Sequence, residues 1–484
     1  MHKLKVILLL GLLAIILSAC AKVGSFFGDI PQEGTPTRTI IVTPKSSATP
    51  EIQATPTITK EAAIDYCVSC HTDKQKLIDS ASPEQPQPIL GNGVNLLGEV
   101  PKMELWQKVL VDGEFPKSIH GLNGCVDCHK GVQSPDKSVA HTEIIPNPSR
   151  DPQALCGKCH PDIVSSFPNS LHFNQAGFWK ALEKRSMPST QDALQQALQG
   201  NCSSCHVSCG ECHVSQPNVT GGGFVKGHMF NRVPSMEHNC AVCHGSRVGN
   251  EYLGKNPGLP ADVHYEKGKM GCAGCHTGHD LHGQPAECSK CHPGPKDANL
   301  QPVDHRYGGV QAPSCESCHP NVTTGQDGIL FHQMHGGNLS CQVCHSVAYN
   351  NCDSCHVAMD VKTNQATFDL QKSYFTFLIG RNPIQSYERP YRFVPVRHAP
   401  IVRDTFSFYG EDLLPLFDKV ETWTYATPHN IQRTTPQTES CNACHGNPAF
   451  FLTADKVAPD ELQANQKVII NTVPPVISSA SQLP

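Results

Sequence analysis

The sequence lacks three features that would point to common classes of protein. Its formal net charge is -5, which excludes a nucleic-acid binder driven by overall positive charge. The apolar run near the N-terminus spans 12 residues, whereas a helix needs ~20 to cross a bilayer. Charged residues make up only 17% of the chain, and 38 glycines and 39 prolines accompany them. Long regular helices and broad sheets are therefore not expected.

The N-terminus reads as an export signal. Residues 1–19 place two lysines before the apolar run and small residues after it, which is typical of a secretory signal peptide. Leu17-Ser18-Ala19-Cys20 resembles the lipobox of bacterial lipoproteins, which implies that Cys20 is acylated and anchors the chain to a membrane. The alternative is an ordinary signal cleaved nearby. Residues 20–60 are rich in Thr and Pro and read as an extended stalk after the lipidated cysteine.

The other 24 of the 25 cysteines form twelve C-x-x-C pairs, each followed directly by histidine. We number these motifs 1 to 12 in chain order: Cys67/Cys70/His71, Cys125/Cys128/His129, Cys156/Cys159/His160, Cys202/Cys205/His206, Cys209/Cys212/His213, Cys240/Cys243/His244, Cys272/Cys275/His276, Cys288/Cys291/His292, Cys315/Cys318/His319, Cys341/Cys344/His345, Cys352/Cys355/His356 and Cys441/Cys444/His445. C-x-x-C-H is the signature of c-type haem attachment, because two thiols bond the porphyrin while the adjacent imidazole binds its iron. Disulfides, zinc ribbons and redox-active C-x-x-C pairs do not require that histidine.

On these motifs the chain resembles a bacterial multihaem c-type cytochrome. The resemblance implies twelve covalently bound c-type haems, whose iron takes the motif histidine as its proximal ligand. The expected fold is mostly irregular, with short α-helices packed around a chain of haems and little β-structure. A C-x-x-C-K variant, familiar from nitrite reductases, is absent.

The second axial position of each iron can be filled by histidine. Thirteen histidines lie outside the motifs and the signal: His120, His141, His172, His228, His238, His264, His279, His282, His305, His332, His335, His398 and His429. Twelve sites could all be bis-histidine with one imidazole to spare. Methionine is the competing axial ligand. Only seven methionines remain after Met1, so methionine can bind a minority of the haem irons at most. His279/His282 and His332/His335 are close pairs, so one member of each is expected to reach a distant haem.

The spacing of motifs divides the chain into regions. Residues 61–200 hold motifs 1–3, residues 201–370 hold motifs 4–11, and residues 371–470 hold motif 12 within an aromatic and arginine-rich stretch; residues 471–484 read as a disordered tail. A helix is expected from Ser189, as its cap, through Gln199. Its apolar residues Ala193, Leu194, Ala197 and Leu198 fall on one face, which is expected to be buried. Weaker candidates for helices lie over 101–110 and 178–184.

The arginine-rich stretch has two interpretations. Its arginines are Arg381, Arg389, Arg392, Arg397 and Arg403. Their guanidinium groups could neutralise haem propionates and form a lid, because arginine suits bidentate carboxylate contacts. Alternatively the stretch forms a substrate or partner site, with His398 or His429 beside an open haem.

The sequence thus predicts an exported, lipid-anchored electron carrier at the cell envelope, on its periplasmic face or at the cell surface. Its expected partners are redox proteins or an extracellular acceptor, with no nucleic acid. One alternative is a multihaem reductase of a small nitrogen or sulfur compound at an open haem. Another is a subunit of a haem filament, against which a lipid anchor argues.

Overall fold

The computed structural model describes residues 64–81, 103–202, 207–284, 313–322, 325–347, 354–360, 365–371, 377–386 and 389–478. All of them fall in the compact unit that spans residues 64–484. The predicted signal, Cys20 and the stalk lie outside the described residues. Within the unit, segments from all three predicted haem regions contact one another; Arg185, for example, donates to the carbonyl of Glu421 at 2.7 Å. The region boundaries at 200 and 370 therefore divide only the sequence.

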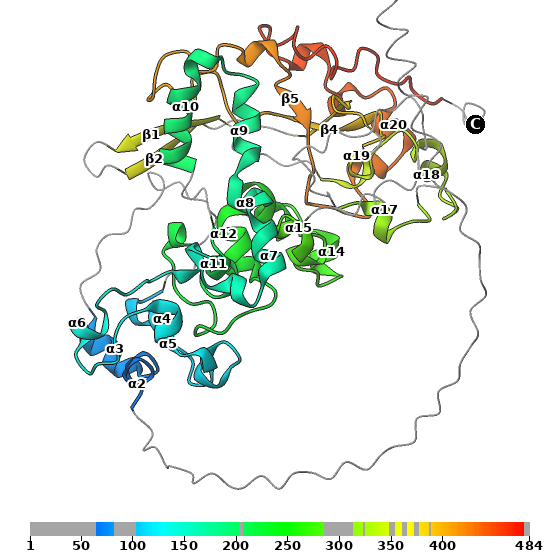
Figure 1. Cartoon of the computed structure of the whole chain (residues 1–484). Helices are drawn as coiled ribbons and strands as arrows, with labels where there is room; N and C mark the ends of the chain where they lie inside the picture. Colours follow the sequence, from blue (N-terminus) through cyan, green and yellow to red (C-terminus); the bar gives the residue numbers. More distant parts are fainter. Residues whose placement is uncertain are drawn as a thin grey trace, which may run out of the picture. The chain divides into compact units, whose positions relative to one another are not determined.

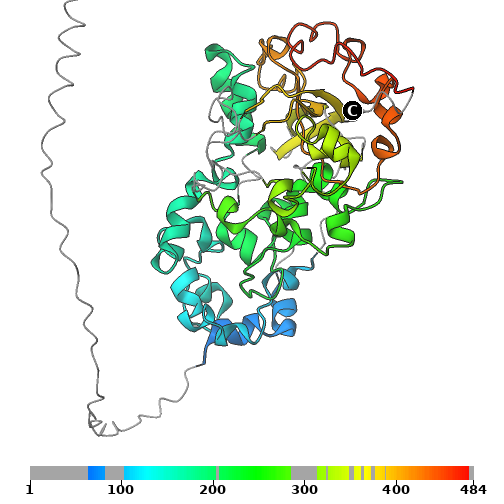
Figure 2. The same cartoon turned by 90° about the vertical axis from the view of Figure 1, so that its right-hand side faces the viewer.

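Short helices carry most of the regular structure (Figure 1). They are α2 Tyr66–His71, α3 Lys74–Ser80, α4 Leu105–Val109, α5 Cys125–His129, α6 Lys137–Ala140, α7 Pro161–Ser166, α8 Leu171–Asn174, α9 Ala176–Glu183, α10 Gln191–Ala197, α11 Cys209–His213, α12 Ala241–His244, α13 Asn250–Tyr252, α14 Val263–Glu266, α15 Gly278–Leu281, α17 Cys315–Cys318, α18 Leu330–His335, α19 Cys341–His345 and α20 Cys441–Cys444. The view from the side shows the same succession of brief turns (Figure 2). None of the described helices has the length and apolar character that a bilayer span requires.

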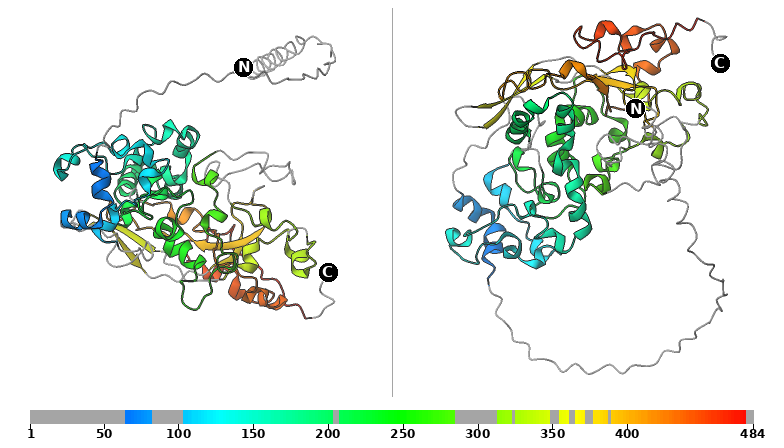
Figure 3. Two further views of the ribbon diagram at one scale, coloured as in Figure 1. Left: turned by 90° about the horizontal axis from the view of Figure 1, so that it is seen from below. Right: turned by 45° about the horizontal axis from the view of Figure 1, so that its top comes forward.

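The strands form two small antiparallel sheets. The hairpin β1 Ser354–Asp360 and β2 Gln365–Gln371 is one; the other has the order β3-β4-β5, with β3 Leu378–Arg381, β4 Phe393–His398 and β5 Trp423–Tyr425. Figure 3 draws the strands as yellow and orange arrows. Gly380 of β3 lies against β4 so closely that a Cβ would come within 2.7 Å of the Val396 side chain. The expected fold class, short helices and irregular structure with little sheet, is confirmed.

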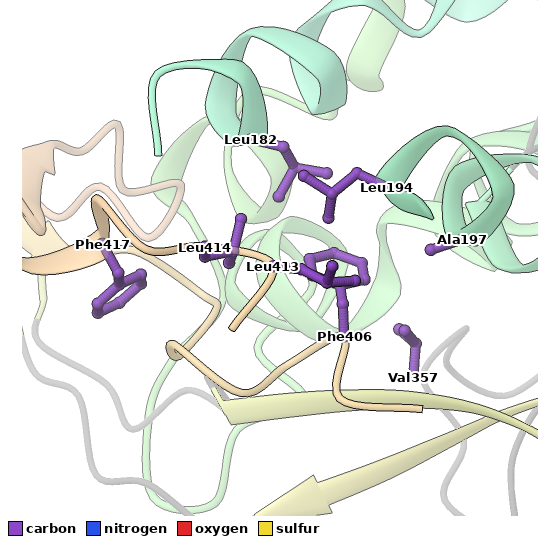
Figure 4. Packing of buried hydrophobic residues seen from close by; sticks show 8 residues of the cluster. All are labelled: Leu182, Leu194, Ala197, Val357, Phe406, Leu413, Leu414 and Phe417. Atoms are coloured by element: carbon purple, nitrogen blue, oxygen red, sulfur yellow. The ribbon is translucent and has the colours of Figure 1, made fainter. Parts of the chain in front are cut away.

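Buried hydrophobic side chains gather in clusters that draw mostly on the second half of the chain, together with α9 and α10. Leu194 and Ala197 of α10 are fully buried against Leu413, Leu414 and other residues of one cluster (Figure 4). A second cluster fills the space between the three-stranded sheet and residues 452–469. These apolar faces account for most of the buried core and hold the sheet in place.

The sequence-based helices are found with shifted ends. The helix expected from Ser189 is α10, and its predicted buried face is confirmed. The cap prediction was wrong: Ser189 lies in a preceding 3-10 turn, and Thr190 stands at the N-cap without a side-chain hydrogen bond. A π-helical turn then ends at Cys202. The weaker candidates correspond to α4 and α9.

The C-terminal residues 471–478 are not a free tail. The amide of Ile477 donates to the side chain of Asn442 at 2.9 Å, and Asn442 donates back to the Ile477 carbonyl at 3.0 Å. The amide of Gly446 donates to the Pro474 carbonyl at 2.7 Å. The prolines that suggested disorder instead keep this segment extended, so that its backbone can pair with motif 12. Residues 479–484 lie outside the described residues.

Candidate haem-ligand sites

Nine of the twelve motifs have described side chains, namely motifs 1, 2, 3, 5, 6, 7, 9, 10 and 12. Each occupies a short helix or a single 3-10 turn, as α5 does for motif 2. One helical turn brings residues three apart to the same side, so both cysteines of a motif face one ligand while the histidine follows.

The proximal histidines predicted for motifs 4, 8 and 11 are not placed by the structure. His206 and His292 lie outside the described residues, as do Cys205 and both cysteines of motif 8. His356 differs, because its backbone lies in strand β1 opposite Asp369 of β2, but its side chain is outside what the structure describes. Motif 11 therefore ends in a strand rather than in the helical turn of the nine described motifs. The assignment of His206, His292 and His356 as iron ligands stays a prediction from the sequence.

Each of the nine described motif histidines stands opposite one histidine from elsewhere in the chain. The ring centroids are 5.8–6.4 Å apart. The pairs are His71 with His141, His129 with His228, His160 with His120, His213 with His282, His244 with His172, His276 with His429, His319 with His264, His345 with His332, and His445 with His335. As predicted, the neighbours His332 and His335 face different motifs, 10 and 12.

The separation fits one metal ion between two imidazoles. With metal–nitrogen bonds of about 2.0–2.1 Å on opposite sides, two ring centroids lie roughly 6 Å apart. All eighteen rings line one connected cavity of about 6000 Å³, whereas an ordinary ligand pocket measures about 300–1,000 Å³. The residues present therefore fit a series of haems.

Hydrogen bonds fix the orientation of many of these rings. Among the motif histidines, Nδ1 of His71 donates to the Val109 carbonyl at 3.1 Å, and Nδ1 of His445 donates to that of Pro475 at 3.0 Å. His129, His213 and His345 make the same kind of bond, to Ile145, Asn231 and Gln432 respectively. A proton held on Nδ1 leaves the Nε2 lone pair for a metal.

Burial keeps several of the opposed imidazoles neutral. Desolvation, with neighbouring histidines, lowers the pKa of His172, His228 and His429 to about 4. Desolvation by burial also lowers the pKa of His244. Iron binds only the neutral ring, so these histidines need lose no proton to act as ligands at neutral pH.

Close packing positions some distal rings. His282 precedes Gly283, whose φ is +66° and where a Cβ would approach the Ser170 amide nitrogen to 2.4 Å. Ser166 Oγ donates to the His282 carbonyl at 3.0 Å, and Ser170 Oγ donates to that of Leu281 at 2.7 Å. Only glycine allows this contact, which fixes the turn that carries His282.

Comparison with known proteins agrees with the motifs and the paired histidines. Residues 51–253, which include motifs 1–6, match the family model described as outer membrane cytochrome MtrC/MtrF-like, domains II/IV. The chain is a multihaem c-type cytochrome. Neither a curated protein nor a solved structure matches it.

The attachment cysteines of the cytochrome touch in pairs. In motifs 1 and 2, the Cys67 and Cys125 sulfurs and an Asp65 oxygen lie within 4.8 Å of one another. Hydrogen bonds between first cysteines likewise join motifs 3 and 5, motifs 6 and 7, and motifs 9 and 10. These cysteines would attach haem as thioethers, so their contacts would hold neighbouring haems close together.

Other cysteines lie near one another and connect one pair to the next. Cys128 of motif 2 lies near Cys156 of motif 3, and Cys212 of motif 5 lies near Cys240 of motif 6. Cys275 of motif 7 lies near the cysteines of motif 9, and Cys344 of motif 10 lies near Cys444 of motif 12. The described motifs thus form the continuous series 1-2-3-5-6-7-9-10-12.

His398 differs from the paired histidines. Its Nδ1 donates to the carbonyl of Ala399 at 2.8 Å, and its Nε2 lies 2.9 Å from the carboxylate of Glu461. Both ring nitrogens therefore face oxygen acceptors, which leaves neither lone pair for iron. His238 and His279 face no motif histidine among the described residues, and His305 lies outside them.

The arginine-rich stretch matches neither interpretation completely. Arg403 donates to Asp412 at 3.0 Å and to Asp418 at 3.3 Å, so carboxylates of the chain itself bind this guanidinium group. Arg389 and Arg392 do line the cavity. They are the members of the group placed to meet a propionate.

Several residues that shape the sites escaped the sequence reasoning. Asp262 and Asp327 bond to Nδ1 of His264 and His332, and the carbonyl of Pro475 bonds to that of His445. The Asp-x-His spacing at residue 262 was the one available signal. Carbonyl acceptors carry no sequence signal, because every residue has one.

Proposed function

We propose that this cytochrome binds twelve haems, each between two histidines, and relays electrons along an ordered series outside the cytoplasm. Each haem iron, when bound, takes up and gives back one electron and exchanges it with a neighbouring haem. The chain's cysteines hold the series in order, and its histidines keep both axial positions filled. The nine described pairs of opposed histidines carry this proposal.

The remaining histidines complete the account. Four of the thirteen candidate distal histidines lie outside the nine pairs. Three motif histidines have no assigned partner, namely His206, His292 and His356 of motifs 4, 8 and 11. Because both nitrogens of His398 are engaged, His238, His279 and His305 are assigned to those motifs. His398 is then the spare imidazole. With every axial position filled by histidine, no haem is left open for a small substrate, and a relay is favoured over a reductase.

The series of cysteine contacts supports the relay further. A hydrogen bond joins the first cysteines of motifs 3 and 5, and cysteines of motif 7 lie near those of motif 9, as those of motif 10 lie near those of motif 12. A continuous path through nine haems therefore needs no contribution from motifs 4, 8 and 11, which are assigned to branches. Branch haems would offer additional points of contact for redox partner proteins.

The place of action follows from two observations. The matched family model is described as an outer membrane cytochrome, and residues 1–19 have the pattern of an export signal, with Cys20 directly after them. We assign the protein to the cell envelope, held by the lipidated Cys20, with redox proteins or an extracellular acceptor as partners. A Cys20→Ser variant should then be released from washed membranes with its haems intact; retention in the membrane fraction would contradict the anchor.

Spin state tests the relay against the reductase. Pyridine haemochrome and intact mass should give twelve haems, and EPR should show low-spin iron throughout. His429→Ala should produce one high-spin haem that binds cyanide. His398→Ala, which also removes a buried imidazole of the C-terminal region, should produce none. His141→Ala repeats the test at an exposed ligand if the buried variant fails to assemble. Several high-spin haems in the unmodified protein would instead support a reductase.

A further inference from the structure

Two of the nine opposed histidines differ from the others in what holds their Nδ1. His264 Nδ1 donates to the carboxylate of Asp262 at 2.9 Å, and His332 Nδ1 donates to that of Asp327. His264 faces motif 9 and His332 faces motif 10. Both haems of this adjacent pair would therefore have an imidazole ligand bound to an anionic group.

The other opposed histidines have a neutral acceptor or none recorded among the described residues. Nδ1 of His141 donates to a backbone carbonyl, that of Lys137, at 2.7 Å. Nδ1 of His335 likewise donates to the carbonyl of Phe331, at 3.2 Å. Nδ1 of His228 and of His429 is buried without a hydrogen-bond partner in the described structure. Among the nine described pairs, the carboxylate contact is thus specific to motifs 9 and 10.

The Asp262 site is built into the fold. Its side chain is 2% exposed and caps α14 by accepting from the amide of His264 at 2.7 Å. Its second oxygen accepts from the amide of Ile431 at 2.7 Å. These two backbone hydrogen bonds hold the carboxylate in one orientation, so its contact with the imidazole does not depend on a mobile side chain. Asp327 is held similarly, by the amide of Ile329 at 3.1 Å.

We propose that Asp262 and Asp327 are positioning residues that lower the midpoint potentials of the haems at motifs 9 and 10 below those of the rest of the described series. A hydrogen bond to a carboxylate draws the Nδ1 proton away from the ring and raises the electron density at Nε2. A more basic axial ligand stabilises ferric over ferrous iron. The inference rests on the proposed function, because it requires His264 and His332 to be axial ligands.

The two sites are neighbours in the series. First cysteines Cys315 and Cys341 of motifs 9 and 10 are hydrogen bonded, and this pair lies between motif 7 and motif 12. A low-potential pair inside the path would be the last to be filled with electrons. Electrons arriving from either end would then collect on the flanking haems before they cross.

Matched variants test the role of the two carboxylates. Asp262→Asn and Asp327→Asn keep a hydrogen-bond acceptor and remove the charge. Asp136→Asn is the control: Asp136 caps α6, the helix that ends at the ligand His141, but it bonds to the Val139 amide and not to the imidazole. Each variant is first checked for twelve haems and low-spin iron, and then titrated by spectroelectrochemistry. Near-infrared magnetic circular dichroism follows the imidazolate character of the ligands.

In each single aspartate variant, the part of the absorbance change that belongs to one haem should move from the lowest midpoint potential to a higher one. In the double variant the part that belongs to two haems should move, and in the Asp136→Asn control none should. The near-infrared bands should shift toward those of neutral bis-imidazole haem. Unchanged potentials in both single variants, with twelve low-spin haems present, would overturn this inference and leave the relay intact. High-spin iron in the unmodified protein would overturn the relay itself. If Asp262→Asn loses haem, the more exposed Asp327 decides the question by the same measurements.

Discussion

Residues 64–164, the N-terminal region, and residues 377–478, the C-terminal region, are built in opposite ways. The first holds three motifs, and among its described side chains only Leu77 and Val164 are buried hydrophobics. The second holds motif 12 alone and contains the three-stranded sheet with its hydrophobic clusters. Where the attachment sites are dense, the polypeptide builds no core of its own.

The apolar side chains of the N-terminal region face the haem cavity instead. Ile119 and Leu122 are 81% and 75% exposed, and both line that cavity. In the C-terminal region, by contrast, Val394, Val396 and Leu452 are fully buried by other side chains. The comparison teaches that the cofactors take the place of a hydrophobic core in one region and are supported by a core in the other.

The largest expected effect is that the N-terminal region loses its ordered structure when haem is absent. A chain made without residues 1–19, the predicted export signal, should acquire no haem and should lose amide protection throughout residues 64–164. It should keep protection in the C-terminal region, because the clusters there need no cofactor. Hydrogen-exchange mass spectrometry of the haem-free and loaded proteins measures this. Equal protection of the two regions in the haem-free chain would break the comparison.

A core substitution should have a smaller and local effect. Leu452→Ala removes a fully buried side chain from the second cluster and should destabilise the C-terminal region by about 2–5 kcal/mol. Haem content should stay at the level of the unmodified protein. The matched control is Phe408→Ala at a half-exposed site of the same region, for which a change within about 0.5 kcal/mol is expected.

Hydrogen exchange at peptides covering residues 452–470 reads out the core variants. Loss of protection confined to the C-terminal region would show that this region alone depends on the side-chain core. An equal loss over residues 64–164 would show that the two regions do not differ in what supports them.

The smallest effect concerns the buried pair of Glu461 and His398. Burial by itself would raise the pKa of Glu461, but hydrogen bonds from His398 and Thr422 outweigh it and hold the pKa below its usual value. A lowered pKa in the folded state contributes stability that is present above the unfolded pKa of about 4.3 and is lost as pH falls through the folded value.

Glu461→Gln should therefore weaken the C-terminal region at pH 7 by about 1–3 kcal/mol, because His398 loses an anionic partner. The difference from the unmodified protein should shrink as the pH falls below 4. Exchange protection at residues 452–470, measured at pH 7 and below pH 4, shows whether the destabilisation shrinks as the pH falls. A constant difference between them would mean that Glu461 is not ionised in the folded protein.

Much of the site could be read from local patterns. Twelve motifs predict the attachment cysteines and proximal histidines, since attachment chemistry needs adjacent residues at fixed spacing. The count of thirteen further histidines predicted opposed imidazoles, and the structure places nine of them in pairs. The buried face of α10 also followed from periodicity, whereas its cap and the order of residues 471–478 did not. Those depend on where the chain folds back, which local propensity does not decide.

What the sequence by itself determined is the chemistry: which residues can attach and bind haem, and that the regular structure between them is short. The assignment of ligands to motifs required the tertiary structure. It shows that His429 faces motif 7 and that His332 and His335 face different motifs. It also shows that His398 bonds to Glu461 and that Asp262 holds the ring of His264. Covalent attachment is a short-range property and is written in neighbouring residues. A second ligand and its hydrogen-bond partner come from distant segments, so they are fixed only when packing brings those segments together.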